Sequence, residues 1–225
     1  MKRWLCAALA LILVLGLAVD IPIQVNAGTM TSSKAFIEVL KKNEGFSAKP
    51  YWDYAQYSIG YGTKCPDDIL AAYNKYGTTI TEEKATELLI AALPKYEDAV
   101  NWLAKQYNLT FSQHQFDALV SFTYNCGTSW VYETDGYFNR AVREGKSSSA
   151  LLYGMCLWSS AGGEYILIKR RLSEANMYLN GVYESYSDSS DGTYPATYKY
   201  VFLDGNGGTS HYTIHGYDAA DPVAV

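Results

Sequence analysis

The sequence predicts an α+β fold, mainly α, with two lobes: a small β-hairpin lobe, a larger helical lobe and a cleft between them. Apolar residues recur at helical spacing in several segments between residues 33 and 180. Residues 46–64 are instead rich in aromatic and β-prone residues and contain closely spaced glycines. The 225 residues suffice for a sizeable core and favour one domain with appendages.

The N-terminal half should begin with a helix over residues 33–43. Ser32 and Ser33 are its N-cap candidates, and Gly45 offers a left-handed stop. The hairpin lobe follows over residues 46–64.

Further helices are predicted from capping and breaker residues. One runs from Pro66 toward Tyr76 and ends at Gly77, and Thr81 caps a longer one that Pro94 interrupts and that resumes to Tyr107. The pair Ser112 and Gln115 forms a capping box that opens the most apolar helix, which Gly127 stops. Three more helices are expected near residues 134–144, 148–158 and 165–180.

Residues 1–27 have the pattern of a secretory signal peptide. Lys2-Arg3 precede an apolar run from Trp4 to Val19, and small residues before Gly28 suit cleavage after Ala27. The sequence therefore predicts a secreted, extracytoplasmic protein. The alternative is a membrane tether through residues 4–19, although this run is shorter than the ~20 residues of a spanning helix.

The C-terminal residues 184–225 differ in composition from the domain at 28–183. The start of this tail is rich in Ser, Asp, Gly and Tyr, as linkers are, and alternating apolar residues flank Asp204-Gly205-Asn206-Gly207-Gly208. We expect a linker and a short β-hairpin. A docked or poorly ordered tail is favoured over a wall-binding module, because a lone hairpin is marginally stable.

Composition limits the possible partners. A net charge of −5 argues against nucleic acid, since phosphate contacts need a basic face. The scattered His114, His211 and His215 suggest no metal site, and no cofactor is expected. The 21 Tyr and 5 Trp supply flat amphipathic faces suited to sugars, although most should pack in the core. We expect a monomer.

Four cysteines occur in the chain. Removal of Cys6 with the signal leaves an odd set, and therefore at least one free thiol or an external partner. Cys126 and Cys156 fall on apolar helix faces, where packing is the usual role. Cys65, after the hairpin, is predicted to be the more exposed thiol.

The carboxylates of Glu44 and Asp53 are the candidate catalytic pair, nine positions apart across the helix end and the hairpin. Glycoside hydrolysis uses such a pair. One protonated acid protonates the leaving oxygen, and one ionised group activates water or attacks the anomeric carbon. The sequence leaves retention or inversion open, because the outcome depends on the carboxyl separation.

Five motifs, in order over residues 33–181, resemble those of the phage-type lysozymes, which are also called endolysins or muramidases. They are Glu44-Gly45 with Tyr51-Trp52-Asp53 and Ser58-Ile59-Gly60-Tyr61-Gly62, then Thr79–Ala85, Phe111–Gly127, Trp158 with Ala161-Gly162-Gly163, and Lys169–Ala175. The matching family patterns begin with E-G, Y-x-D and T-I-G-Y-G. The resemblance implies a lysozyme-like fold.

The resemblance also implies catalytic roles. Glu44 would be the general acid, kept protonated by burial at its helix end. Asp53 would stay ionised and position water or stabilise positive charge on the sugar. Ser58, where the family usually has threonine, would hold that water. The stretch from Asp53 to Ser58 is one residue shorter than in the family and lacks its turn glycine, so the Asp53 carboxylate could point differently.

Substrate contacts are implied at Asn125, Arg170 and Tyr61. Asn125 can equally be interpreted as a helix C-terminal cap near Gly127. Arg170 or Arg171 could pair with Glu44 across the cleft or could lie on a solvated helix face. Trp158 is expected in the core of the larger lobe.

The function implied is an exported, bacteriolytic lysozyme. It would hydrolyse the β-1,4 bonds between N-acetylmuramic acid and N-acetylglucosamine in the glycan strands of bacterial peptidoglycan. The alternatives are a chitinase-like or transglycosylase activity and a non-catalytic cell-wall-binding module on the same fold.

Overall fold

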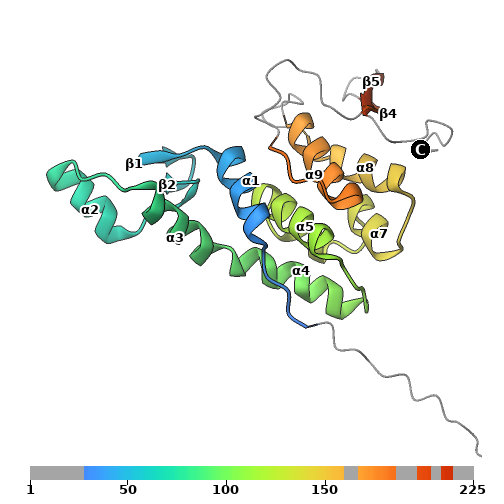
Figure 1. The fold of residues 1–225 in the computed structure, drawn as a ribbon, viewed down its shortest axis with the longest axis horizontal. Coiled ribbons are helices and arrows are strands. Elements are labelled where there is room, and N and C mark those ends of the chain that lie inside the picture. Colours follow the sequence, from blue (N-terminus) through green and yellow to red (C-terminus); the bar gives the residue numbers. More distant parts are fainter. Residues whose placement is uncertain (1–27, 160–166, 186–196, 204–208, 215–225) are drawn as a thin grey trace, which may run out of the picture.

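The computed structural model describes residues 28–159 and 167–185 in full, together with the backbone of two strands between 197 and 214. A small lobe of strands and two helices projects from a larger bundle of helices (Figure 1). The predicted signal peptide lies outside the described residues, as does much of the tail. Among the described residues, no helix combines the length and the apolar character needed to cross a membrane.

The small lobe is built on an antiparallel sheet with the strand order β1-β2-β3. These strands are β1 (Ser47–Asp53), β2 (Gln56–Gly60) and β3 (Thr63–Lys64). Asp53 pairs with Gln56, so the hairpin turn consists of Tyr54 and Ala55 alone. Tyr54 takes a positive φ of 46°, a conformation that glycine adopts at lower cost. The predicted hairpin is therefore confirmed, with a turn of two residues and no glycine.

Helix α1 (Lys34–Glu44) is set by local signals at both ends. The Ser33 side chain accepts a hydrogen bond from the Phe36 backbone N–H, and Gly45 follows with a φ of 70°. Phe36, Val39 and Leu40 are buried on one face, as the amphipathic pattern predicts. The helix therefore delivers Glu44, its last residue, to the edge of the hairpin lobe.

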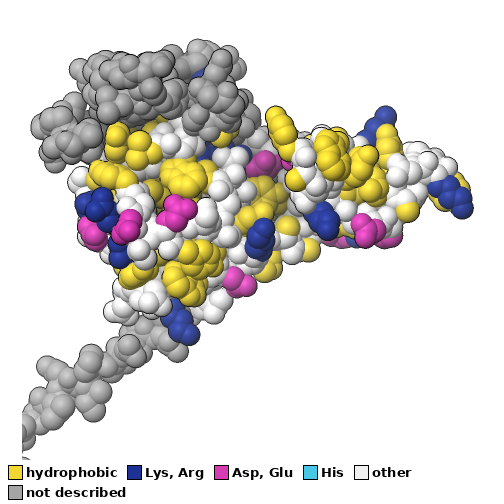
Figure 2. Space-filling view, turned by 180° about the vertical axis from the view of Figure 1, so that it is seen from behind, with side chains coloured by type: hydrophobic (Ala, Val, Ile, Leu, Met, Phe, Trp, Pro, Cys, Tyr) yellow, Lys and Arg dark blue, Asp and Glu magenta, His cyan; other side chains and the backbone are white. Residues whose placement is uncertain are grey.

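Helices α2 (Asp67–Tyr76) and α3 (Glu82–Ala92) complete the small lobe. At Gly60 a Cβ atom would lie 2.8 Å from the Cβ of Ala85, so only glycine allows α3 to lie this close to β2. α2 buries none of its residues. Hydrophobic side chains accordingly lie on the surface of the projecting lobe (Figure 2), and Trp52, Tyr54 and Tyr76 are its most exposed large ones.

The larger lobe surrounds α5, whose capping box at Ser112 and Gln115 is present as predicted. Residues 116–123 of α5 are all buried. The surrounding helices contribute most of the remaining core. The helices of the larger lobe, with α5 included, are α4 (Pro94–Gln106), α5 (Gln113–Cys126), α6 (Ser129–Tyr132), α7 (Tyr137–Arg143), α8 (Ser148–Cys156) and α9 (Ile168–Asn180).

Three features differ from or extend the predictions. The short helix α6 was not predicted, because its N-cap Thr128 makes no side-chain capping bond and four residues carry no periodicity. Cys65 is buried, with 2% of its surface exposed, and Cys126 is the more exposed thiol, so that prediction was wrong. In the tail, β4 (Thr197–Leu203) pairs antiparallel with β5 (Thr209–Ile214).

Candidate active site

Glu44 lies where the hairpin lobe meets the helical lobe, and its two carboxylate oxygens have different surroundings. Oε1 is 2.6 Å from an Nη2 atom of Arg170 on α9. Oε2 faces the hairpin, 3.7 Å from the position that a Cβ on Gly62 would take. Only 18% of the Glu44 side chain is exposed. One oxygen is therefore held by a buried cation, and the other is directed toward the small lobe.

Gly62 is the point at which several groups approach Glu44. Its φ of +78° favours glycine, and the Tyr51 and Tyr124 hydroxyls lie 4.0 Å from its hypothetical Cβ. Tyr124 comes from α5 and donates a hydrogen bond of 2.8 Å to the Tyr61 carbonyl in the small lobe. That bond ties the two lobes together beside the catalytic candidate.

The phenols around Glu44 are held in their neutral form. Burial, Asp53 and Glu44 all raise the pKa of Tyr51. Burial and Glu44 likewise raise the pKa of Tyr96 and of Tyr124. Tyr96 packs on Tyr124 with the ring centroids 4.9 Å apart. Neutral phenols can donate hydrogen bonds, so the carboxylate has polar neighbours without further negative charge.

Asp53 and Ser58 lie on the same face of the hairpin as Tyr51. Tyr51 pairs directly with Ser58, and Asp53 is two residues further along β1, so all three side chains point to one side. Asp53 contributes to the raised pKa of Tyr51, which also senses Glu44. Although the turn is short, the Asp53 carboxylate therefore lies on the side of the sheet that faces the Glu44 neighbourhood.

Ser58 is fully buried, and its Oγ has no hydrogen-bond partner among the described residues. A buried hydroxyl without a partner carries a desolvation cost of about 1–3 kcal/mol. A polar group in this state is suited to bind a water or a substrate atom.

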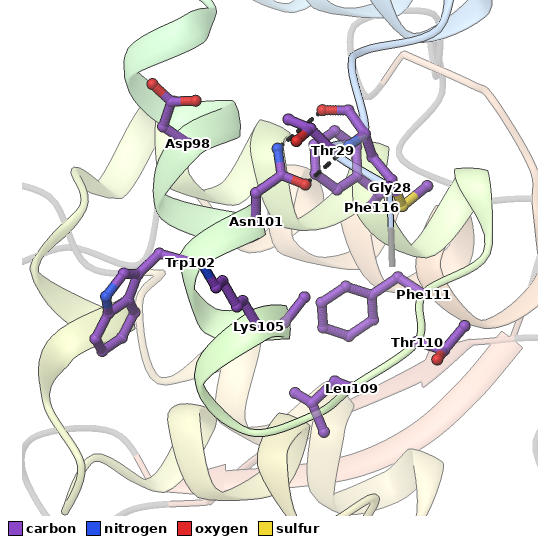
Figure 3. Close-up of a pocket in the computed structure, with 12 residues that line it drawn as sticks. Gly28, Thr29, Asp98, Asn101, Trp102, Lys105, Leu109, Thr110, Phe111 and Phe116 are labelled. Carbon is purple, nitrogen blue, oxygen red and sulfur yellow. Dashed lines mark hydrogen bonds between the residues drawn. The ribbon is translucent and has the colours of Figure 1, made fainter. Parts of the chain in front are cut away.

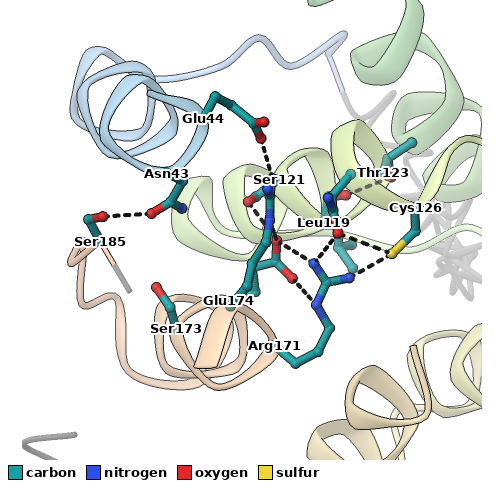
Figure 4. Close-up of polar contacts among 12 residues, drawn as sticks. Asn43, Glu44, Leu119, Ser121, Thr123, Cys126, Arg171, Ser173, Glu174 and Ser185 are labelled. Carbon is teal, nitrogen blue, oxygen red and sulfur yellow. Dashed lines mark hydrogen bonds and ion pairs between the residues drawn. The ribbon is translucent and has the colours of Figure 1, made fainter. Parts of the chain in front are cut away.

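Arg170 connects Glu44 to a buried network in the large lobe. Figure 4 shows Glu174, Ser121 and Arg171 of that network together with Glu44. Its Nε lies 3.2 Å from Oε1 of Glu174, and Glu174 also accepts from Ser121 Oγ at 2.8 Å. Arg171 lies 3.0 Å from the other oxygen of Glu174. Burial alone would lower the pKa of Arg170, but Glu44 and Glu174 raise it overall, so the guanidinium stays charged.

A family model for phage lysozymes matches residues 41–174. The chain belongs to the phage lysozyme family. It is 32% identical to the endolysin of Bacillus phage B103 over 76% of its own length, and it spans 61% of the length of that endolysin.

Solved structures of phage lysozymes share the fold. An endolysin from Escherichia coli O157:H7 phage FAHEc1 matches with a TM-score of 0.58 at 32% identity, over 71% of this chain and 99% of that one. A crystal structure of a P22 lysozyme mutant matches with a TM-score of 0.56 at 31% identity, over 67% of this chain and 99% of that one. The predicted lysozyme-like α+β fold is therefore confirmed.

Of the three residues predicted to contact substrate in this phage lysozyme chain, Arg170 alone contacts Glu44 in the structure, and Tyr61 and Asn125 make other contacts. Tyr61 is 3% exposed and its ring packs on Phe46, which favours a packing role. The Oδ1 atom of Asn125 accepts from Arg171 at 2.7 Å. Of the two arginines that were considered as partners of Glu44, Arg170 forms the ion pair.

Several residues of the site were not predicted. Tyr96, Tyr124 and Glu174 come from three different helices and approach Glu44 or its arginine only in the folded chain. Tyr124 and Glu174 lie within recognised motifs, which was the available signal. Trp158 packs edge-on to Phe122 with the centroids 5.9 Å apart, as expected of a core residue.

A separate cavity of about 350 Å³ lies in the large lobe (Figure 3). Trp102, Lys105 and Phe111 are among its lining residues, and none of the catalytic candidates is. The Asn101 amide beside it exchanges two hydrogen bonds of 2.9 Å with the Met30 backbone. The segment around Met30 therefore forms one wall of this cavity. Glu44, Asp53 and Ser58 do not line it. No cluster of metal-binding side chains occurs in the part of the chain that the structure describes.

Proposed function

We propose that the protein is an exported muramidase that hydrolyses the β-1,4 bond between N-acetylmuramic acid and N-acetylglucosamine in bacterial peptidoglycan. The observation that carries the proposal is that the two oxygens of the Glu44 carboxylate have different surroundings. Arg170 holds Oε1 at 2.6 Å, and Oε2 faces the hairpin that carries Asp53 and Ser58. The family membership supports the same chemistry.

In the proposed mechanism, Oε2 of Glu44 carries the proton that passes to the glycosidic oxygen as the bond to the anomeric carbon breaks. The electron pair of that bond stays with the leaving oxygen, and positive charge develops on the sugar ring. The ionised Asp53 stabilises this charge or directs the attacking water, whose oxygen bonds to the anomeric carbon while one of its protons passes to Asp53 or to solvent. The buried Ser58 hydroxyl is suited to hold that water.

The test is Glu44→Gln, which removes the proton donor and keeps the shape of the side chain. Turnover of purified peptidoglycan should fall by ~10²–10⁴, the usual contribution of general acid catalysis. Glu38→Gln is the matched control, because Glu38 lies on the same helix with 66% of its side chain exposed. A folded Glu44→Gln protein that keeps more than about a tenth of wild-type turnover would show that Glu44 is not the acid.

Product analysis distinguishes the alternative activities. Hydrolysis releases muropeptides with reducing ends, and a transglycosylase would release anhydro-muramic ends. Mass spectrometry of digested walls separates the two. A wall-binding module without activity would bind peptidoglycan and give no zone of clearing in a zymogram.

We further propose that residues 1–27 direct export and are removed. The basic start, the apolar run and the small residues before Gly28 support this proposal. The secreted protein should then begin at Gly28 by N-terminal sequencing. Recovery of a membrane-bound form that still contains Cys6 would support the tethered alternative.

A further inference from the structure

Glu174 is a buried carboxylate whose contacts all lie within the large lobe. It is fully buried on α9, and its Oε1 contacts Ser121 Oγ at 2.8 Å and Arg170 Nε at 3.2 Å. Its Oε2 lies 3.0 Å from Arg171 Nε. A carboxylate buried to this extent is stable only when charged donors surround it, and here two arginines do so.

The same Arg170 guanidinium therefore binds two carboxylates. Its Nε faces Glu174, and its Nη2 faces Glu44 at 2.6 Å. A guanidinium is planar and rigid, so fixing one edge also fixes the direction of the other donors. The position of the atom that holds Glu44 Oε1 is thus set by Glu174.

We propose that Glu174 is a positioning residue of the active site: it fixes Arg170 so that Arg170 holds Oε1 of Glu44 and leaves Oε2 facing the hairpin. This inference rests on the proposed function of Glu44 as the acid. Glu174 itself touches none of the reacting atoms. Its effect passes through Arg170, and a misplacement of about 1 Å can cost on the order of 10² in rate.

Charge balance gives the proposal a second readout. When Glu44 carries its proton, as the proposed mechanism requires, Arg170 and Arg171 place two positive charges against the single negative charge of Glu174. Removal of the Glu174 charge would add a second excess positive charge beside Glu44, which favours the ionised form of the acid. The alkaline limb of the pH–rate profile should then move to lower pH.

The other titratable groups around Glu44 stay the same in that experiment. They are Tyr51 from β1, Tyr96 from α4 and Tyr124 from α5, whose pKa values burial and Glu44 raise together. The charge of Asp53 also raises the pKa of Tyr51. None of them contacts Glu174 by a hydrogen bond or an ion pair described above, so a shift of the alkaline limb reports on the arginine group.

The first experiment compares two variants of α5 that each lose one buried hydroxyl, after circular dichroism has shown that both fold. Ser121→Ala removes the hydroxyl that donates to Glu174. Thr123→Val removes a hydroxyl that donates to the Leu119 carbonyl at 2.6 Å and accepts from the Trp130 indole N–H at 3.1 Å, with no contact to Glu174. Both delete one buried hydroxyl from the same helix. We expect Ser121→Ala to lower kcat about two- to fivefold with an unchanged KM, and Thr123→Val to leave kcat unchanged. Equal kcat values for both variants and wild type would overturn the proposal.

The second experiment removes the charge. In Glu174→Gln the negative charge that fixes the Arg170 guanidinium is lost, so we expect kcat to fall at least tenfold, KM to stay within twofold, and the alkaline limb to move to lower pH. The double variant Glu174→Gln with Arg171→Gln removes one negative and one positive charge, so the buried group keeps the net charge of wild type. It also provides the test if the single variant does not fold. It should return the limb to its wild-type position and keep the low kcat.

The outcomes separate the two proposals. If wild type digests peptidoglycan and folded Glu174→Gln keeps its kcat and its pH profile, Glu174 has only a structural role. If kcat recovers fully in the double variant, only charge matters and the positioning role is wrong. If wild type itself fails to digest peptidoglycan, the proposed function fails instead.

Discussion

Substitution of Gly62 by alanine should reduce activity through a contact at the active site, in addition to a loss of stability from the backbone. Gly62 has a φ of +78°, which an alanine adopts at a cost of about 1–2 kcal/mol. The added methyl carbon would lie 3.7 Å from Glu44 Oε2 and 4.0 Å from two tyrosine hydroxyls, which are ordinary contact distances. The stability loss should therefore come from the backbone alone.

The activity loss has a different origin. A glycosidic oxygen must come within about 2.6–3.2 Å of the proton donor. A methyl group at 3.7 Å from Oε2 occupies the side from which that oxygen approaches in our mechanism. We expect turnover to fall about a hundredfold, equivalent to about 2.7 kcal/mol of transition-state free energy.

Gly77→Ala is the matched control. Gly77 has a similar φ of +70°, and its hypothetical Cβ meets nothing within 4 Å. Both variants should lose about 1–2 kcal/mol in urea unfolding, and only Gly62→Ala should lose turnover, measured as reducing ends released from peptidoglycan. If Gly62→Ala keeps wild-type turnover, the substrate does not approach Oε2 from the Gly62 side and the mechanism must be revised.

Three further predictions concern the hairpin and the segment after α9. Asp53→Ala should lower turnover a hundredfold or more, and a fully active Asp53→Ala would remove Asp53 from the mechanism. Ser58→Ala should lower turnover by about tenfold at most, since a hydroxyl that holds one water supplies roughly 0.5–1.5 kcal/mol. Ser58→Thr should keep a turnover close to that of wild type. A chain that ends after Gly181 should be less active in the reducing-end assay than one that ends after Ser185, because Ser185 Oγ donates at 2.7 Å to the side chain that precedes Glu44; equal activities would contradict this role. Burial and a hydrogen bond to a carboxylate raise the pKa of Tyr183 to about 12, so the stability from its protonated form is complete below pH 10 and is lost as the pH rises toward 12. Urea unfolding should show this decline in wild type and a smaller one in Tyr183→Phe, and an identical decline in both would assign it to other groups.

Elements set by local chemistry could be predicted from the sequence. Ser33, Thr81 and Ser112 cap their helices through their own side chains, and Gly77 ends α2 in the left-handed conformation. Each of these signals acts within about four residues, so the sequence order is sufficient to identify it. The same holds for the hairpin that carries Asp53.

Contacts over long sequence distances could not be predicted in this way. The choice between Arg170 and Arg171 as the partner of Glu44 depends on the rotation of α9 against α1, which neither helix specifies alone. Cys65 follows a hairpin and a lysine, which suggested exposure, yet its backbone N–H bonds to the Tyr57 carbonyl and the thiol is buried. Such outcomes depend on how separate elements pack together.

The anchoring of both edges of the domain to α5 has a further consequence. Asp117 of α5 accepts the Ser33 backbone N–H at 3.1 Å through one oxygen and the Tyr183 hydroxyl at 2.7 Å through the other. Residues near the start and the end of the fully described part of the chain therefore meet on a single buried carboxylate. Domains with adjacent ends tolerate insertion and circular permutation. A short linker could therefore join these ends, and new termini could be opened at the exposed loop around Gly77. The permuted chain could then be inserted into a surface loop of another protein, and the helix that carries Glu44 would stay anchored.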